Sequence, residues 1–347
     1  MRQVGERRVH APRSAGTKRP LPILVFLMLL YAVVAQDAPV AAGPPGPGLR
    51  AVVSELHGGS STLWVVDPAE PRRRAMLSAV AHAEGWGLKA QTSPDSRYVA
   101  YLVLPSGATD PDRQAELWAL DVAAGASRLL GSGLDLLGAL RWSPDSTSVV
   151  ARRTAPDDPR RSFSLLAFNP SGVADPVTLA TVRNADWAGA VGWWGGAFAY
   201  ATLDAQGTKL HYSSDQSLPL TPGIARDISI SQESGAASFV ELGVGQEPAI
   251  AGIASLSDRT VERNLHLRPF GPVLRTGDPA NDFLLNSIVR LGERLGMAAD
   301  FSAAVYLVPA GLGGARGGDY LAAVDFTRLA VRPLAFRGHA EFAGWLE

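Results

Sequence analysis

The sequence contains no cysteine. This absence excludes disulfides, thiolate-ligated metal sites and cysteine nucleophiles. It also excludes a lipidated N-terminal cysteine, so any attachment to a membrane must come from the peptide chain itself. The remaining composition is that of a globular protein, with 46% hydrophobic and 19% charged residues in a chain of 347.

Lysine is scarce, and arginine carries nearly all of the positive charge. Six basic residues and one acidic residue precede residue 36. The rest of the chain therefore has 26 basic and 32 acidic residues, a net charge of −6. Binding to nucleic acid requires a basic stripe. The moderately acidic body argues against a nucleic-acid partner.

Charge is absent from residues 20–36, which follow a basic segment at 1–19, and Ile23 to Ala35 is wholly apolar. A basic segment followed by an apolar core of roughly 7–15 residues is the pattern of a signal peptide. The uncharged stretch can also span a locally thinned bilayer. We predict that residues 1–35 are a signal peptide or a membrane anchor, and the long basic segment favours the anchor. Both alternatives place the rest of the chain outside the cytoplasm.

Proline and glycine fill residues 39–47, where no hydrophobic periodicity is present. Such a composition gives an extended, semi-stiff chain. We therefore assign residues 36–48 to a linker and residues 49–347 to one folded domain.

A turn motif recurs in that domain. Ser-Pro-Asp-Ser stands at 93–96 and again at 143–146, each time between two short strand-like runs. Around these turns we predict four strands per unit, the first strand of the third unit lying at 137–142. Units of four strands repeating every ~40–50 residues are typical of propeller blades.

A second repeat supports this interpretation. It consists of a leucine, three mostly apolar residues and an aspartate or asparagine, and it suits a buried strand followed by a turn. The copies begin at Leu63, Leu117, Leu165 and Leu321, with looser copies at Leu210 and Ile253. Six such strands predict an all-β, six-bladed propeller.

The first unit lacks its innermost strand, because residues 50–56 align with the second strand of other units. The missing strand is found at the other end of the chain, where residues 339–346 match residues 136–142 with Trp345 in register with Trp142. We predict that this C-terminal strand completes blade one and leaves no free sheet edge at the seam. In the sixth unit, apolar residues at helical spacing predict an inserted helix over 281–295, with a longer strand as the alternative.

These repeats resemble the TolB-type, WD-like β-propeller repeats of exported bacterial proteins. The resemblance rests on the Ser-Pro-Asp-Ser turns and on the Leu-Trp strands that begin at Leu63 and Leu117. It implies a binding platform in the periplasm or at the cell surface, and only rarely a catalyst.

No catalytic constellation is evident. The chain has no Gly-x-Ser-x-Gly nucleophile motif, no phosphate-binding loop, and no dinucleotide fingerprint between a strand and a helix. Its six histidines are isolated in the sequence. An enzyme interpretation nevertheless stays open, because related propellers hold a metal in the central channel. The alternative function is therefore a metal-dependent hydrolase acting on a lactone, sugar or ester.

Two polar loops are the candidate binding surface. They join the second and third strands of adjacent blades, so they are expected to be neighbours at one mouth of the channel. Either they dock a partner or hold a hard cation through their carboxylates, or they are ordinary solvated turns. We also include Trp187 in this candidate surface, because it is the tryptophan that we expect to be exposed. The loop residues are Asp110, Asp112, Arg113, Asp157, Asp158, Arg160 and Arg161.

The sequence thus predicts an extracytoplasmic, non-catalytic and monomeric propeller. Its expected partner is a protein or a cell-envelope component, and the N-terminal helix would contact the membrane. We assign no catalytic residue, no metal ligand and no cofactor, although a divalent cation remains open.

Overall fold

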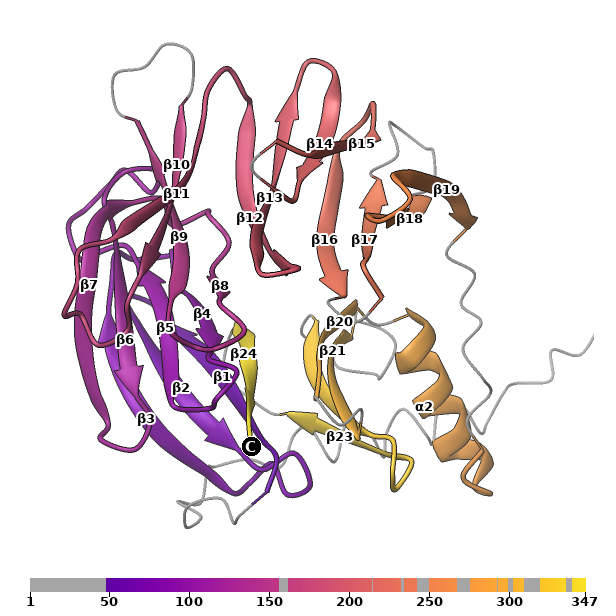
Figure 1. Cartoon of the computed structure of the whole chain (residues 1–347). Coiled ribbons are helices and arrows are strands. Elements are labelled where there is room, and N and C mark those ends of the chain that lie inside the picture. Colours follow the sequence, from indigo (N-terminus) through magenta and orange to yellow (C-terminus); the bar gives the residue numbers. More distant parts are fainter. Residues whose placement is uncertain are drawn as a thin grey trace, which may run out of the picture.

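A computed structural model describes residues 48–155, 162–213, 215–231, 234–241, 250–266, 275–291, 293–298, 302–308, 319–334 and 339–347. Its strands form six four-stranded antiparallel sheets arranged as a ring (Figure 1). The predicted all-β, six-bladed propeller is confirmed. The predicted signal or anchor segment and most of the linker fall outside the described residues.

The first three blades follow the order of the chain, except for one strand. Blade one consists of β24 (Ala340–Leu346), β1 (Arg50–His57), β2 (Ser60–Val66) and β3 (Arg74–Ala81). Blade two consists of β4 (Leu88–Thr92), β5 (Tyr98–Val103), β6 (Ala115–Asp121) and β7 (Ala126–Leu134). Blade three consists of β8 (Arg141–Trp142), β9 (Val149–Thr154), β10 (Phe163–Phe168) and β11 (Val177–Val182).

The last three blades are each continuous in the chain. Blade four consists of β12 (Trp187–Trp194), β13 (Ala197–Asp204), β14 (Gly207–His211) and β15 (Ser217–Thr221). Blade five consists of β16 (Ala225–Ser231), β17 (Ala236–Glu241), β18 (Ile250–Ser255) and β19 (Thr260–His266). Blade six consists of β20 (Glu293–Met297), β21 (Ala303–Val308), β22 (Tyr320–Asp325) and β23 (Ala330–Leu334).

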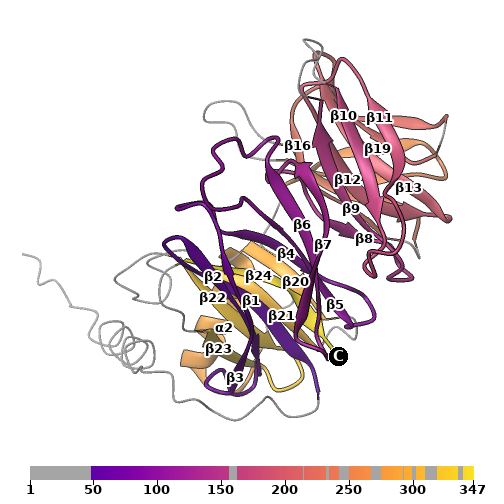
Figure 2. The same ribbon diagram turned by 90° about the vertical axis from the view of Figure 1, so that its left-hand side faces the viewer.

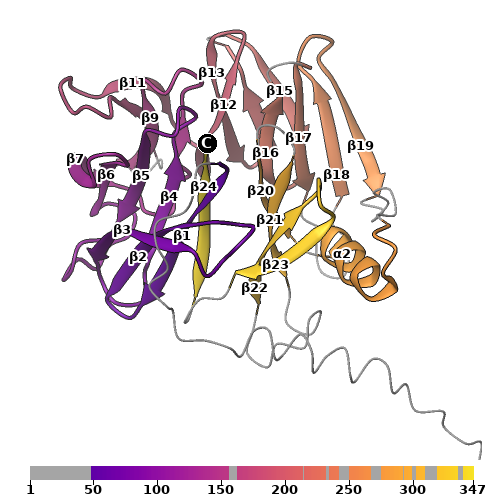
Figure 3. The same ribbon diagram turned by 90° about the horizontal axis from the view of Figure 1, so that it is seen from below.

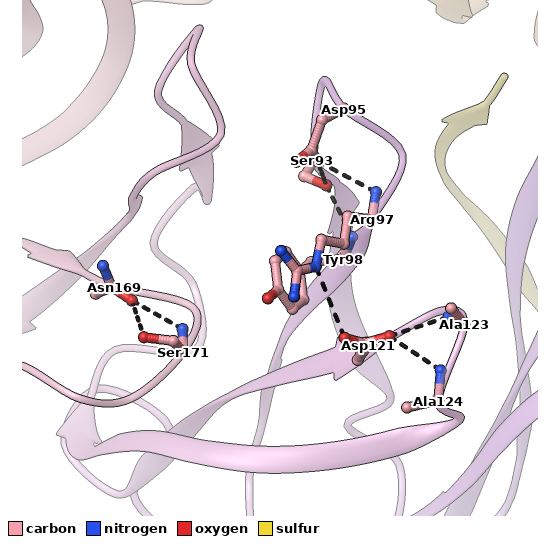
Figure 4. A network of polar contacts seen from close by, with 9 residues as sticks. All are labelled: Ser93, Asp95, Arg97, Tyr98, Asp121, Ala123, Ala124, Asn169 and Ser171. Carbon is pink, nitrogen blue, oxygen red and sulfur yellow. Dashed lines mark hydrogen bonds and ion pairs between the residues drawn. The ribbon is translucent and has the colours of Figure 1, made fainter.

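The Ser-Pro-Asp-Ser turns are closed by their own side chains. The Ser93 hydroxyl donates to the Asp95 carboxylate at 2.6 Å and accepts from the Tyr98 N–H at 2.9 Å (Figure 4). Ser96 ends the turn with a φ of 60°, and Ser146 repeats this with 58°. Since serine and aspartate bond readily to turn backbone, the motif fixes a tight reversal between the first two strands of a blade.

In blades two and three, an aspartate or asparagine at the end of the third strand caps the next turn. Asp121 Oδ1 accepts from the N–H groups of Ala123 and Ala124 at 3.1 and 3.0 Å (Figure 4). Asn169 holds the equivalent place in blade three, where its Oδ1 accepts from the Ser171 N–H at 2.9 Å. This capping explains why the second repeat ends in aspartate or asparagine.

The C-terminal strand closes the ring as predicted. Six residues of β24 pair with β1, from Arg50 opposite Leu346 to Glu55 opposite Ala340, with a bulge between Val52 and Val53. The Glu347 N–H then donates to the Ser96 hydroxyl at 2.9 Å, so the chain end lies beside blade two (Figure 2). Residues almost 300 positions apart thus share one sheet.

Apolar clusters join neighbouring blades. Leu102, Leu117 and Leu134 of blade two pack in one cluster with Trp142 and Phe168 of blade three. Other clusters join blades one and two, three and four, four and five, and six and one. Blades one to four therefore bury their faces against both neighbours, as a propeller requires.

The predicted insertion helix is confirmed as α2 (Pro279–Leu291), although its end is corrected. Residues 293–297 belong to β20, so Leu295 lies in a strand and not in the helix. Leu285 and Ile288 pack on Tyr306 and Val324 of blade six. The helix thus lies on the side of blade six that faces away from blade one (Figures 1 and 3). Within the described residues, no helix is long and apolar enough to cross a bilayer.

Candidate functional site

The inner strands of the blades, β24, β4, β8, β12, β16 and β20, surround the axis of the ring (Figure 1). Between those of blades one, two, three and six lies a cavity of about 610 Å³. The polar residues that line this cavity are Lys89, Gln91, Thr92, Ser93, Ser96, Arg141, Trp142, Glu341, Trp345 and Glu347.

The two mouths of this cavity differ. Each inner strand runs from the side of the ring that carries the loops between second and third strands toward the side that carries the Ser-Pro-Asp-Ser turns. We call these sides the loop face and the turn face. Lys89 and Glu341, at the starts of β4 and β24, lie toward the loop face. Ser96 and Glu347 lie at the turn face.

An ion pair joins blades one and two near the loop face. Lys89 Nζ lies 3.1 Å from Glu341 Oε1, and the His339 ring nitrogen lies 3.4 Å from the same oxygen. Both members of the Lys89–Glu341 pair are partly open to solvent, so the pair contributes little to stability. Its charges compensate each other at this end of the cavity.

Arg141 is the uncompensated cation of the cavity. Its Nε donates to the Val191 carbonyl in blade four at 3.3 Å, and its Nη1 donates to the Leu140 carbonyl at 2.9 Å. Across the described part of the chain, no carboxylate lies within ion-pair distance of it. Burial lowers the pKa of this guanidinium, but arginine remains charged in proteins. The channel therefore holds a positive charge that carbonyl dipoles alone stabilise.

Two further polar groups of the lining have no hydrogen-bond partner among the described residues. They are the Gln91 side-chain oxygen, an acceptor, and the Trp345 indole N–H, a donor, and both atoms are buried. The Gln91 backbone oxygen, in contrast, accepts from Trp142 Nε1 at 3.0 Å. Most buried polar groups in folded proteins are hydrogen-bonded, so these two atoms are exceptions.

The structure places the first predicted loop, 105–114, at the loop face. Asp110 Oδ1 accepts from the Asp112 N–H at 3.1 Å, and Asp110 Oδ2 lies 4.0 Å from Arg113 Nε. The amide oxygen of Gln114 caps the same loop. These contacts are internal to the loop, and Asp112 and Arg113 point outward from it.

The second predicted loop, with Asp157, Asp158, Arg160 and Arg161, lies outside the described residues. Trp187 begins β12 and is half-buried, with the Arg152 guanidinium 5.9 Å from its ring. Its predicted role as a contact residue stays a prediction. No grouping of three or more histidine, aspartate or glutamate side chains suited to a metal ion occurs in the described ranges.

Sequence reasoning missed the residues of the channel. In the two best repeats, Gln91 and Arg141 occupy the same position, two residues before the serine of the turn. A polar residue at the same position of both repeats is the signal that would have found them. The two loops drew attention because their charge is dense, whereas the channel gathers single residues from separate blades.

No family model matches this sequence, and no curated protein matches it. Among solved structures, TolB from Acinetobacter baumannii has a TM-score of 0.53 at 14% identity, covering 86% of this chain and 68% of that protein. An oligogalacturonate lyase from Vibrio parahaemolyticus has a TM-score of 0.43 at 10% identity, covering 82% and 79%. At such identities the comparison concerns the fold alone. The chain therefore has the fold of the TolB-type β-propellers.

Proposed function

We propose that this protein is an exported, non-catalytic binding platform that receives part of a protein or cell-envelope component in its channel. The observation that carries the proposal is Arg141, a cation that lines the cavity with no carboxylate within ion-pair distance among the described residues. A ligand that brings an anion to this guanidinium would form charge-assisted hydrogen bonds with it. The cavity volume falls in the range of roughly 300–1,000 Å³ typical of ligand sites.

The loop face would make the outer contacts of the same partner. Asp112 and Arg113 are exposed there and carry opposite charges. Charges at the rim of an interface raise the rate of association and select partners more than they raise affinity. Asp157, Asp158, Arg160 and Arg161 would extend this mixed-charge rim into blade three. Export would follow from the N-terminal segment, as a released or a tethered protein.

The experiment compares a substitution that narrows the channel with a control substitution of the same kind on the outer surface of the ring. Leu295 lines the cavity from β20 with 37% of its side chain exposed. Val177 lies on the outer strand of blade three with 61% exposed. The full chain and the variants Leu295→Trp and Val177→Trp are immobilised and incubated with envelope extract from the organism that makes the protein.

We expect the wild type and Val177→Trp to retain the same component, and Leu295→Trp to retain at least ten-fold less. Equal retention by all three proteins would show that binding does not use the channel. If nothing is retained by the wild type, the platform proposal is wrong. Exchanging Asp110, Asp112, Asp157 and Asp158 for alanine in a separate variant measures the part played by the loops.

A further inference from the structure

Apolar packing seals five of the six boundaries between neighbouring blades. The clusters that join blades one and two, two and three, three and four, four and five, and six and one each contain side chains of both blades. Neither an apolar cluster nor a backbone hydrogen bond joins the described residues of blades five and six. This boundary therefore lacks the packing that holds neighbouring blades of a propeller together.

Helix α2 takes the place on blade six that blade five would occupy. Its residues Leu285 and Ile288 pack on Tyr306 and Val324, on the side of blade six that faces away from blade one (Figures 1 and 3). That cluster contains no residue of blade five. Blade six thus buries its second apolar face without a neighbouring blade.

The face of blade five that points toward blade six is open to solvent. A row of paired residues, one from each strand, crosses this face: Ser229, Ser238, Ile253 and Glu262. All four are exposed, and Ile253 has an exposed fraction of 43%. Because successive residues of a strand point to opposite faces, Phe239 lies on the other face, where it is buried against blade four.

The equivalent residues of blade two lie at a sealed boundary. Ala100 holds the place of Ser238, since each stands seven residues after the serine that begins its turn. Their strand partners, Ala119 and Ile253, correspond in the same way. Ala100 and Ala119 are 0% and 2% exposed, and Ala100 packs in the cluster shared with blade three. The sequence itself therefore differs at this point, because a serine hydroxyl suits a face in water and is costly to bury without a partner.

We propose that the ring opens between blades five and six while its other boundaries stay closed. Separating two blades that share an apolar cluster exposes that cluster to water, which is unfavourable. Separating the described residues of blades five and six exposes no such cluster, so opening is easiest there. The boundary is bordered at the axis by β20, which also carries Leu295 into the wall of the cavity. The opening goes beyond the proposed binding function and does not depend on the ligand.

The test measures distances between pairs of nitroxide spin labels in frozen solution. Because the chain has no cysteine, the labels attach only to introduced cysteines. The pair Glu262→Cys and Arg332→Cys spans blades five and six. The matched pair Arg128→Cys and Val177→Cys spans blades two and three. All four residues are exposed and hold equivalent places on the outer strands of their blades.

We expect the distance distribution across blades five and six to be roughly twice as wide as that across blades two and three, because an unsealed boundary admits several separations. Two further pairs test whether a single blade moves. Met76→Cys with Arg332→Cys spans blades six and one, and Ser217→Cys with Glu262→Cys spans blades four and five. Both are expected to give narrow distributions.

Equal widths for all four pairs would overturn the inference. A wide distribution for either of the two further pairs would also overturn it, because the spread would then belong to one loose blade and not to the boundary. The melting temperature of every labelled variant is recorded, so that only folded proteins are compared.

Stability gives an independent test of the same boundary. Ser238→Leu is expected to leave the melting temperature unchanged, because the side chain extends into open space. Ala100→Leu overpacks a sealed boundary and is expected to lower the melting temperature by several degrees. A comparable fall for Ser238→Leu would show that blades five and six are packed together, and the proposed opening would be wrong.

Discussion

The Ser146 hydroxyl accepts a hydrogen bond at 3.0 Å from the backbone N–H of Asp95, one blade earlier in the ring. Ser96, the equivalent residue of blade two, accepts in the same way from Glu347 of blade one. The last serine of the motif therefore links neighbouring blades, in addition to ending its own turn. This second role explains why a serine stands at a position with a φ near +60°, which glycine would adopt more readily.

Replacing Ser146 separates these two roles. Ser146→Gly removes the hydroxyl but also relieves the strain of a Cβ in the left-handed region, so we expect it to lose less stability than Ser146→Ala. Ser146→Ala removes the hydroxyl and keeps the Cβ that serine already places in the left-handed region, so we expect a loss of about 1 kcal/mol in the free energy of unfolding. Urea unfolding of both variants tests this order. Equal stability of the alanine variant and the wild type would show that the inter-blade bond contributes nothing.

A buried ion pair fixes the junction of blades two, three and four. Arg152 Nη2 lies 2.6 Å from Asp135 Oδ2, with side chains 7% and 2% exposed, and Arg152 Nη1 donates to the Ala188 carbonyl. Removing one partner of such a pair leaves an unpaired buried charge. We expect Asp135→Ala to lower the free energy of unfolding by about 3–5 kcal/mol. Asp112→Ala, in an exposed loop, serves as the control and is expected to unfold like the wild type.

Deletion of residues 339–347 removes β24 and leaves β1 as an unpaired sheet edge. Because a loss of a few kcal/mol lowers a melting temperature by several degrees, we expect a fall of many degrees. Leu346→Ala is the milder variant. Its side chain is fully buried, so a loss of about 2–5 kcal/mol is expected. A deletion variant that melts with the intact protein would contradict ring closure by β24.

His211 gives blade four a dependence on pH. Burial, and then the charge of Lys209, lower the pKa of His211, and Asp204 partly opposes them. Its ring stacks on Tyr200 at 4.6 Å and shares a hydrogen bond with Thr202. The unfolded chain therefore takes up a proton at higher pH than the folded one. The contribution of His211 to stability is full above pH 6.5 and is lost as the pH falls below it.

The measurement compares urea unfolding of the wild type and His211→Gln between pH 7.5 and 5. We expect the wild type to lose more stability over this range than the variant. Lys209→Gln should make the wild-type loss smaller, because it removes one of the charges that lower the pKa. A loss that is identical in the wild type and His211→Gln would assign the pH dependence to other residues.

The ring could be predicted from the sequence because its signals are local and repeated. A serine turn and a capped apolar strand recur in blade after blade, and each copy supports the others. The C-terminal strand was found in the same way, through the match of Trp345 with Trp142. Boundaries were less certain: the first strand of blade three was predicted at 137–142 but is only Arg141–Trp142. Asp135 Oδ1 instead accepts from the Leu137 N–H and turns the chain there.

The site could not be predicted because it has no local pattern. Arg141 is one arginine among many in the sequence, and its lack of a carboxylate partner appears only when the blades are assembled. The end of the insertion helix was wrong for a similar reason. Leu295 continues the apolar spacing of α2, but pairing of β20 with β21 takes residues 293–297 into the sheet. Tertiary pairing here outweighs a local helical pattern.

The pairing of β24 with β1 also sets an order on folding. Blade one contains the first strands of the ring, yet its sheet lacks one strand until residues 340–346 are available. The loop that this contact closes spans nearly the whole domain, and contacts of such sequence separation form slowly. Blades two to five are each built from neighbouring strands and can assemble locally. Blade one, which contains the first strand of the ring, is therefore completed last, and a chain that lacks its final strand leaves β1 unpaired.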